Sequence, residues 1–150
     1  MNIFVLDSSP AIAAQMQCDK HVVKMCLETA QLLCSLFPPG EAPYKRTHYN
    51  HPCGKWTRES YNNYQWLITH GLALCDEYNY RYGKKHKCRD IILWCKDNVR
   101  PNMFPSIGLT EFLKCMPEQF KLNDVVDSYR AYYRGAKKEF AVWTKRNKPR

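Results

Sequence analysis

The sequence lacks a long hydrophobic leader, and it lacks the short motifs that mark the common nucleotide and hydrolase sites. Four consecutive apolar residues, Ile3–Leu6, precede an aspartate, and no cationic segment stands before them. We therefore expect neither a signal peptide nor a membrane span, but a cytoplasmic protein. The patterns G-x-x-x-x-G-K, G-x-G-x-x-G, G-x-S-x-G and H-E-x-x-H are absent, which leaves ATP-loop, dinucleotide, serine-hydrolase and zincin assignments without support.

C-x-x-C pairs are also absent, although the chain contains eight cysteines. They are spread along the sequence and several fall on apolar helix faces, so we expect buried free thiols rather than disulfides. His48, His51 and Cys53 lie close together in the sequence, but no further ligand follows at a spacing typical of zinc sites. We expect no metal and no cofactor, and we expect His48 or His51 to hydrogen-bond a ligand phosphate or to fix a loop.

Acidic residues are few, with 14 Asp and Glu against 23 Lys and Arg, a net charge of +9. The excess gathers in two clusters interleaved with aromatic residues. The first contains Arg81, Lys84, Lys85, Lys87 and Arg89, and the second contains Arg130, Arg134, Lys137, Lys138, Lys145, Arg146, Lys148 and Arg150. Cations beside stacking rings are typical of proteins that bind DNA, RNA or a free nucleotide. A basic solubility surface over an aromatic core is the alternative.

The 150 residues are the length of one ordinary domain, and their periodicity predicts an all-α fold over 1–150. Ser9 and Pro10 predict the start of a short helix, and Asp19 is expected to cap a long amphipathic helix that ends before Pro38. A loop over 38–54 and a long central helix from Trp56 to about residue 81 follow, with Gly83 as its stop.

The C-terminal half predicts three further helices. We expect a helix over 90–98, one or two turns over 110–116, and a basic, aromatic helix opening at Asn123 or Asp124 with Phe140 and Trp143 on its apolar face. Only Ile3–Leu6 resembles a strand, and one short strand cannot make a sheet.

The long amphipathic helix carries a polar stripe beside its apolar face. His21, Lys24, Glu28 and Gln31 are spaced by three, four and three residues, which stacks a base, a cation, a carboxylate and an amide on one side of a helix. This spacing would hold Glu28 on a rigid, half-buried element. A solvated Lys24–Glu28 pair of little energetic consequence is the alternative.

The run from Asp19 to Glu28 is similar, at Asp19, His21 and Glu28, to the first helix of the phage pyrimidine-dimer DNA glycosylases of the endonuclease V type. The segment from Tyr129 to Lys137 resembles that family's DNA-contacting aromatic and basic stretch. The chain also resembles a group of phage proteins that carry D-K-H-V-V-K-M, N-H-P-C and Y-R-Y-G-K. The resemblance implies a small, basic, all-α protein that is active in an infected host cell.

The same resemblance implies a mechanism in which the amino terminus of the chain attacks the sugar C1′ and forms an imine. Glu28 would be the matching carboxylate, His21 an orienting group, and Met1 or Asn2 the residue that carries the amine. An α-amine suits this role because more of it is neutral at physiological pH than of a lysine side chain. Asn2 is bulky enough for Met1 to be retained.

The sequence departs from the family beside the glutamate. The glycosylases have an arginine directly before it and another shortly after it, whereas this chain has Leu27 before Glu28 and Thr29, Ala30 and Gln31 after it. The phosphate-holding pattern around the carboxylate is therefore incomplete.

Two functions remain open at this point. The first is a DNA repair glycosylase and abasic-site lyase that acts on damaged pyrimidines, with phosphates held by Lys24, Arg130, Arg134 and Lys137 and with Tyr129 and Tyr133 as aromatic contacts. The second is a non-catalytic anti-defence protein that sequesters a nucleotide immune signal, such as a cyclic dinucleotide or a cyclic ADP-ribose derivative. Its phosphate contacts would be His48, His51, Arg58, Arg81 and Lys84. Either protein would be a monomer or a homodimer.

Overall fold

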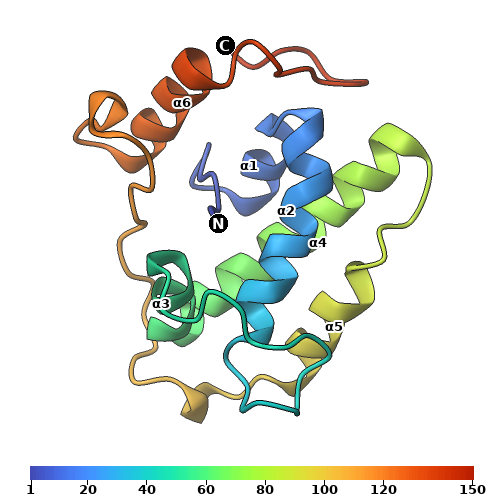
Figure 1. Cartoon of the computed structure of the whole chain (residues 1–150), viewed down its shortest axis with the longest axis vertical. Helices are drawn as coiled ribbons and strands as arrows, with labels where there is room; N and C mark the ends of the chain where they lie inside the picture. The colour runs from blue at the N-terminus through green and yellow to red at the C-terminus, as the bar shows by residue number, and fades with distance from the viewer.

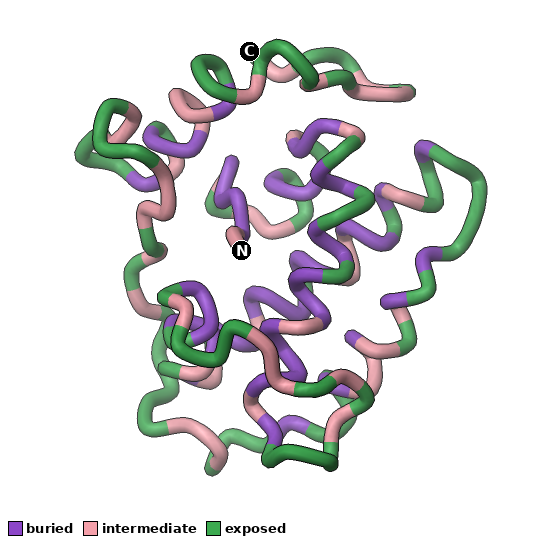
Figure 2. Tube along the Cα trace, in the orientation of Figure 1, coloured by how far each residue is buried: buried purple, intermediate pink, exposed green.

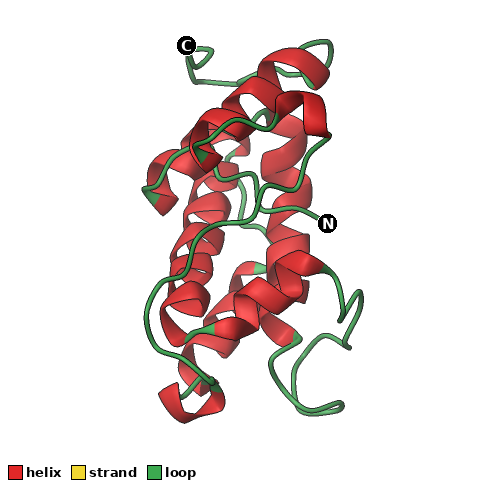
Figure 3. Ribbon diagram, turned by 90° about the vertical axis from the view of Figure 1, so that its left-hand side faces the viewer, coloured by secondary structure: helices red, strands yellow, loops and turns green.

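Helices build the whole molecule, and no strand is present. The structure is a computed structural model that describes all 150 residues (Figures 1 and 3). The α-helices are α1 (Pro10–Met16), α2 (Asp19–Cys34), α3 (Pro52–Glu59), α4 (Tyr61–Tyr82), α5 (Arg89–Asn98) and α6 (Val125–Ala136). Two short 3-10 helices, Pro101–Met103 and Glu118–Phe120, lie between α5 and α6. The all-α prediction is confirmed.

The first two helices begin close to the predicted positions, but one cap differs. The Ser9 hydroxyl accepts a hydrogen bond from the Ile12 amide, and Pro10 opens α1. The predicted cap at Asp19 is wrong, because Cys18 occupies the cap position and Asp19 is the first helical residue of α2. The carboxylate of Asp19 instead accepts hydrogen bonds from distant parts of the chain.

The predicted central helix is divided in two. Ser60 has an extended backbone (φ −145°, ψ 154°), and its side chain caps α4 by accepting from the Asn63 amide. The preceding loop is shorter than expected, because α3 already begins at Pro52 with the His51 ring as its cap. Gly83 ends α4 in the left-handed conformation (φ 70°), as predicted.

The longest helix, α4, lies at the centre of the molecule. It packs against α1 and α2, with α5 and α3 on its flanks. Gly71 lets this packing be close, because a Cβ there would lie 2.8 Å from Thr29 Cγ2 on α2. Direct contact with α4 therefore fixes the position of the part of α2 that follows His21.

The N-terminal segment forms part of the hydrophobic core. Ile3, Phe4, Val5 and Leu6 are all buried, and Figure 2 shows this stretch as a buried trace near the centre of the view. It is not a strand, because Phe4 has a φ of 58° and the Leu6 amide donates to the Phe4 carbonyl, which turns the chain back on itself. The core thus encloses the beginning of the chain.

Two predictions about the C-terminal half are wrong. Residues 110–116 form no helix, because side chains elsewhere bond their backbone groups. The Thr110 amide donates to Asn63 Oδ1, and the Leu113 carbonyl accepts from the Tyr129 hydroxyl. The helix α6 ends at Ala136, so Phe140 and Trp143 follow it in a non-helical segment. Trp143 is held there by a hydrogen bond from its indole to the Met16 carbonyl.

A buried ion-pair network fixes the C-terminal segment against the helices. The Arg81 guanidinium, which is fully buried, contacts Glu77 at 2.7 Å and Asp19 at 3.0 Å. Arg146 contacts Glu77 from the other side at 2.9 Å, and the Thr144 amide donates to Asp19. Each charge has an opposite charge as its partner, and Arg81 and Asp19 have further hydrogen bonds to the Gln15 carbonyl and to Thr144, as a buried ion pair requires.

All eight cysteines are free, and seven of them are buried. No helix has the length and hydropathy that crossing a bilayer requires.

The fold predicts a loss of stability in acid. Burial lowers the pKa of His70 to about 4, because the ring is enclosed in the core against Trp66, and the hydrogen bond to the Pro10 carbonyl only partly opposes this shift. A histidine in the unfolded chain binds a proton near pH 6.5, whereas native His70 does so only at lower pH. As the pH falls, protonation therefore stabilises the unfolded state relative to the native state. Between pH 7 and pH 4 this should reduce the free energy of unfolding by about 3 kcal/mol.

Urea denaturation at several pH values tests this expectation in the wild type and in His70→Gln. The variant should show a shallower fall in the free energy of unfolding over the same pH range, whatever its stability at pH 7. Equal slopes in the two proteins would contradict it.

Candidate active site

The amino group of the chain lies against the carboxylate that the polar stripe singled out. The Met1 nitrogen is 3.8 Å from Glu28 Oε1, and Lys24 Nζ is 3.7 Å from Glu28 Oε2. Figure 1 shows the N-terminus in the middle of the view, near α1 and α2, and Figure 3 shows it at the right-hand side of the molecule. An amine and a carboxylate therefore meet, with a lysine on the solvent side of the pair.

Glu28 is held in a setting that leaves one oxygen without a hydrogen bond. The residue is 8% exposed, and its Oε1 atom is buried and has no hydrogen-bond partner. At 3.8 Å the Met1 nitrogen is too far away to donate a hydrogen bond to it. A buried, unpaired polar atom costs about 1–3 kcal/mol, so this oxygen is kept at the expense of stability.

Asn2 holds the chain in place next to the amine. Its Oδ1 atom accepts from the Ile3 amide at 2.8 Å and from the Tyr129 hydroxyl at 2.9 Å, while its Nδ2 donates to the Cys115 carbonyl at 2.7 Å. The side chain thus ties the N-terminal segment to α6 and to the strap, which is the connection between α5 and α6 over residues 99–124. This geometry gives Asn2 a positioning role.

His51 is the second basic group near the amine. Its Nδ1 accepts from the Cys53 amide, which caps α3 and leaves the proton of the neutral ring on Nε2. Burial lowers the pKa of His51, and the positive charges of the Met1 amine and of His48 lower it further, whereas the charge of Glu28 opposes them. The ring is therefore a neutral neighbour of the amine at physiological pH.

A pair of thiols that no sequence pattern predicted lies near the Met1 amine. Cys53 and Cys115 have their Sγ atoms 3.5 Å apart, although they are far apart in the sequence. The hydrogen bond from Cys53 lowers the pKa of Cys115 to about 7, and the Tyr129 hydroxyl, Lys121 and the Met1 amine act in the same direction. Cys115 reaches Cys53 only because the strap, which follows α5, runs back past α3.

His21 does not lie beside Glu28. It is seven residues earlier on α2, about 10 Å along the helix axis. Its Nδ1 is hydrogen-bonded to the Tyr133 hydroxyl, and its ring stacks on Phe4 with centroids 4.2 Å apart. Burial and nearby lysines lower the pKa of His21 to about 4. His21 therefore does not contact Glu28, and its role as an orienting group stays a prediction.

The predicted ligand contacts of two residues are wrong, that of Arg81 with a phosphate and that of Tyr129 through its ring. Arg81 cannot reach a ligand, because its guanidinium is buried among Asp19, Glu77 and the Gln15 carbonyl. Tyr129 is 1% exposed, and its hydroxyl is used by Asn2 and by backbone groups. Both residues serve the fold.

The remaining predicted contacts fall into three places. Lys24 lies on α2. Lys137 lies at the end of α6, where its Nζ atom is 4.8 Å from the Tyr132 ring. His48 lies in the loop before α3. Arg58 lies on α3, and its guanidinium is 3.8 Å from the ring of Tyr49 in the same loop. The third group, Arg130, Tyr133 and Arg134, borders a cavity beside α6.

Lys84 lies apart from these three groups. It follows Gly83 in the exposed turn between α4 and α5, which Figure 1 places across the molecule from α6.

The Asn2 anchor predicts the effect of removing a single hydroxyl. In Tyr129→Phe, Asn2 loses a donor and the Cys115 amide loses its acceptor, so we expect a loss of about 1–3 kcal/mol in the free energy of unfolding. Hydrogen exchange of the Ile3 and Phe4 amides should also accelerate relative to the core of α4. The matched control is Tyr80→Phe, an exposed tyrosine whose hydroxyl makes one long bond, and it should change stability by less than about 0.5 kcal/mol.

Comparison with known proteins gives one match that covers this site. The family model for pyrimidine dimer DNA glycosylase matches residues 1–90, which is more than half of the chain and includes Met1, Glu28 and His51. No curated protein and no solved structure gives a significant match. The matched region spans α1 to α4, and it contains the buried N-terminal segment and the amine–carboxylate pair. The chain therefore belongs to the pyrimidine dimer DNA glycosylase family.

Proposed function

We propose that the protein is a DNA glycosylase and abasic-site lyase that acts on damaged pyrimidines, with the α-amine beside Glu28 as the nucleophile. The observation that supports this most is the buried Glu28 Oε1 atom, which has no hydrogen bond and faces the Met1 nitrogen at 3.8 Å. A structural ion pair would close to hydrogen-bond distance, as Arg81 and Glu77 do at 2.7 Å. A carboxylate that must accept and return a proton needs a free lone pair.

The reaction begins when the neutral amine attacks C1′ of the damaged nucleotide. The new N–C1′ bond replaces the glycosidic bond, and the base leaves with the bonding electrons and takes a proton from water. Glu28 accepts the proton that the attacking nitrogen releases. It then gives this proton to O4′ as the C1′–O4′ bond opens, which leaves a protonated imine between the amine and the sugar.

Strand cleavage follows from the imine. Loss of a proton from C2′ sends electrons toward the positive nitrogen, the C3′–O bond breaks, and the 3′ phosphate departs. Water then hydrolyses the imine and frees the amine. Glu28 is the buried carboxylate beside the amine that would carry this sugar, and it is the base we assign to this proton.

A row of cations and aromatic rings leads away from Glu28 along α2 and suits a DNA backbone. Lys24 is 68% exposed at its side chain, and Lys20 Nζ lies 5.0 Å from the Phe140 ring. Lys137 lies over Tyr132 and 5.8 Å from the same Phe140 ring. These lysines replace the arginines that the family carries next to its glutamate, because they supply phosphate contacts from neighbouring turns and from α6.

Reduction with borohydride tests the proposal. The wild type, incubated with a duplex that contains either a cyclobutane pyrimidine dimer or an abasic site, should form a stable covalent adduct at its N-terminal residue. Glu28→Gln should reduce the rate of adduct formation by at least about a hundredfold, because the amide cannot carry the proton. Mass spectrometry of the N-terminal peptide identifies whether Met1 or Asn2 carries the sugar.

The matched control is Glu41→Gln, the same substitution at an exposed position of the loop after α2. It should trap DNA as fast as the wild type. The amide at position 28 removes the charge that faces the Met1 amine and Lys24, so urea denaturation of this variant is measured alongside to separate a loss of chemistry from a loss of folding. An absence of adduct with the wild type, or full activity of Glu28→Gln, would overturn the proposal.

A further inference from the structure

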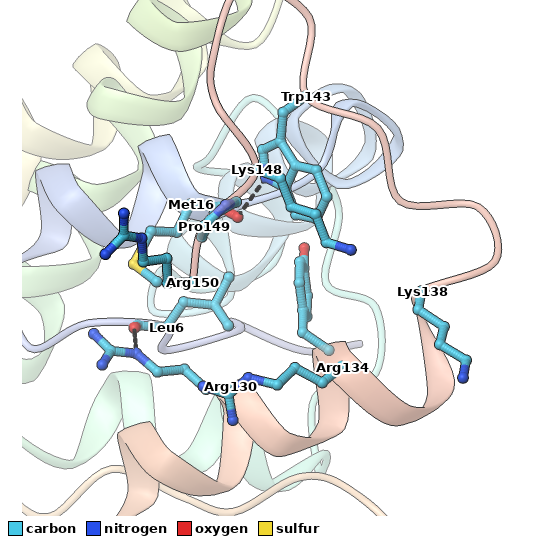
Figure 4. Close-up of a pocket in the computed structure, with 10 residues that line it drawn as sticks. Leu6, Met16, Arg130, Arg134, Lys138, Trp143, Lys148, Pro149 and Arg150 are labelled. Carbon is cyan, nitrogen blue, oxygen red and sulfur yellow. Dashed lines mark hydrogen bonds between the residues drawn. The ribbon is translucent and has the colours of Figure 1, made fainter.

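A cavity beside α6 is separate from the amine and Glu28. It has a volume of about 130 Å³, opens to solvent, and is enclosed by Leu6, by α6 and by the segment that follows Trp143 (Figure 4). This volume is below the range of about 300–1,000 Å³ that whole small-molecule sites occupy, so it can take a ring system only if the rest of the ligand extends over the open rim. The wall that separates it from α2 is Tyr133, whose hydroxyl bonds His21 in the first turns of α2, about 10 Å along the axis from Glu28.

The floor of this cavity is apolar and aromatic, and its polar atoms already have partners. The Trp143 indole donates to the Met16 carbonyl, and the Tyr133 hydroxyl bonds His21 Nδ1 and accepts from the Cys18 amide. The two rings lie with their centroids 6.5 Å apart. They therefore offer ring surface, and not hydrogen-bonding groups, to anything that enters the cavity.

The rim is cationic, and much of its charge is not neutralised. The residues that border the cavity include five cations and no carboxylate. The cations are Arg130, Arg134, Lys138, Lys148 and Arg150. Arg130 is committed to Asp7 and to the Leu6 carbonyl, whereas Arg134 and Lys148 make no ion pair or hydrogen bond within the protein.

Figure 4 separates the rim cations by direction. The Arg134 side chain extends along α6 toward Arg130, below Leu6, and Lys148 stands on the opposite side near Trp143. The Lys138 amine points away from the other labelled side chains. Two unpaired cations, Arg134 and Lys148, thus border an apolar and aromatic hollow from opposite walls.

We propose that this cavity is a binding site for a nucleoside 5′-phosphate, with the base against Trp143 and Tyr133 and the phosphate held by Arg134 and Lys148. A flat ring needs a stacking surface that makes no hydrogen-bond demands, which the floor supplies. A phosphate needs unpaired cations at the rim, and a guanidinium binds it in bidentate fashion. An inorganic anion would gain nothing from the floor, and an uncharged nucleoside would gain nothing from the rim.

This site is independent of the repair chemistry proposed above. No atom of the amine, of Glu28 or of His51 borders the cavity. Occupation of the cavity by a free nucleotide therefore needs neither the nucleophile nor the carboxylate, and Glu28→Gln should bind nucleotide as the wild type does.

Isothermal titration calorimetry of the full chain tests the site with the four ribonucleoside 5′-monophosphates, with adenosine and with inorganic phosphate. At least one monophosphate should bind with one-to-one stoichiometry and at least about tenfold more tightly than adenosine or phosphate. Arg134→Ala removes an exposed cation that has no partner in the fold, and it should weaken nucleotide binding by about tenfold or more. The matched control, Lys87→Ala, removes one exposed positive charge from the turn before α5 and should leave binding unchanged.

Three results would overturn the proposal. The first is that no monophosphate binds more tightly than about 1 mM. The second is that inorganic phosphate binds as well as every nucleotide, which would make the cavity an anion site only. The third is that undamaged duplex DNA displaces the nucleotide and Arg134→Ala weakens both equally, which would make the cavity part of the DNA-binding surface.

Discussion

Burial of Ile3–Leu6, directly after the first two residues, is the constraint on which the site depends. Ile3–Leu6 pack inside the hydrophobic core, and the Asn2 side chain is bonded to backbone and to Tyr129. Chain ends usually fray because nothing holds them. Here the core holds the end, so the amine meets Glu28 at a defined distance without a dedicated binding loop. A mobile terminus would lose the orientation that makes an amine an effective nucleophile.

The two buried acidic sites of the molecule illustrate opposite uses of charge. Glu77 is surrounded by Arg81 and Arg146, and its oxygens are fully satisfied, which locks the C-terminal segment onto α4. Glu28 lies on a neighbouring helix, and its partners are an amine at 3.8 Å and an exposed lysine. One of its oxygens has no hydrogen bond. The first arrangement gives rigidity, and the second leaves a proton acceptor available. The same residue type therefore serves structure or chemistry according to its partners.

Periodicity and local capping were sufficient to predict most of the helices. Ser9, Pro10 and Gly83 act within one turn of the chain, and the structure confirms all three signals. Glu28 was also identified from its place on a helical stripe. The predictions failed where the partner is distant in the sequence. Residues 110–116 are not helical because Asn63 and Tyr129 bond their backbone groups, and Arg81 is buried among acidic residues rather than exposed.

The sequence was enough to establish a basic, all-α chain with a carboxylate on a rigid helix, because helix formation and net charge depend on neighbouring residues and composition. Long-range packing settled which groups meet that carboxylate. The amine, His51 and the thiols of Cys53 and Cys115 come together only when the N-terminal segment enters the core and the strap after α5 returns across α3. The cavity beside α6 likewise exists because Trp143 leaves the helix to reach Met16. Cys53 and Cys115 are 62 positions apart in the sequence and Met16 and Trp143 are 127 apart, and no local pattern encodes such contacts.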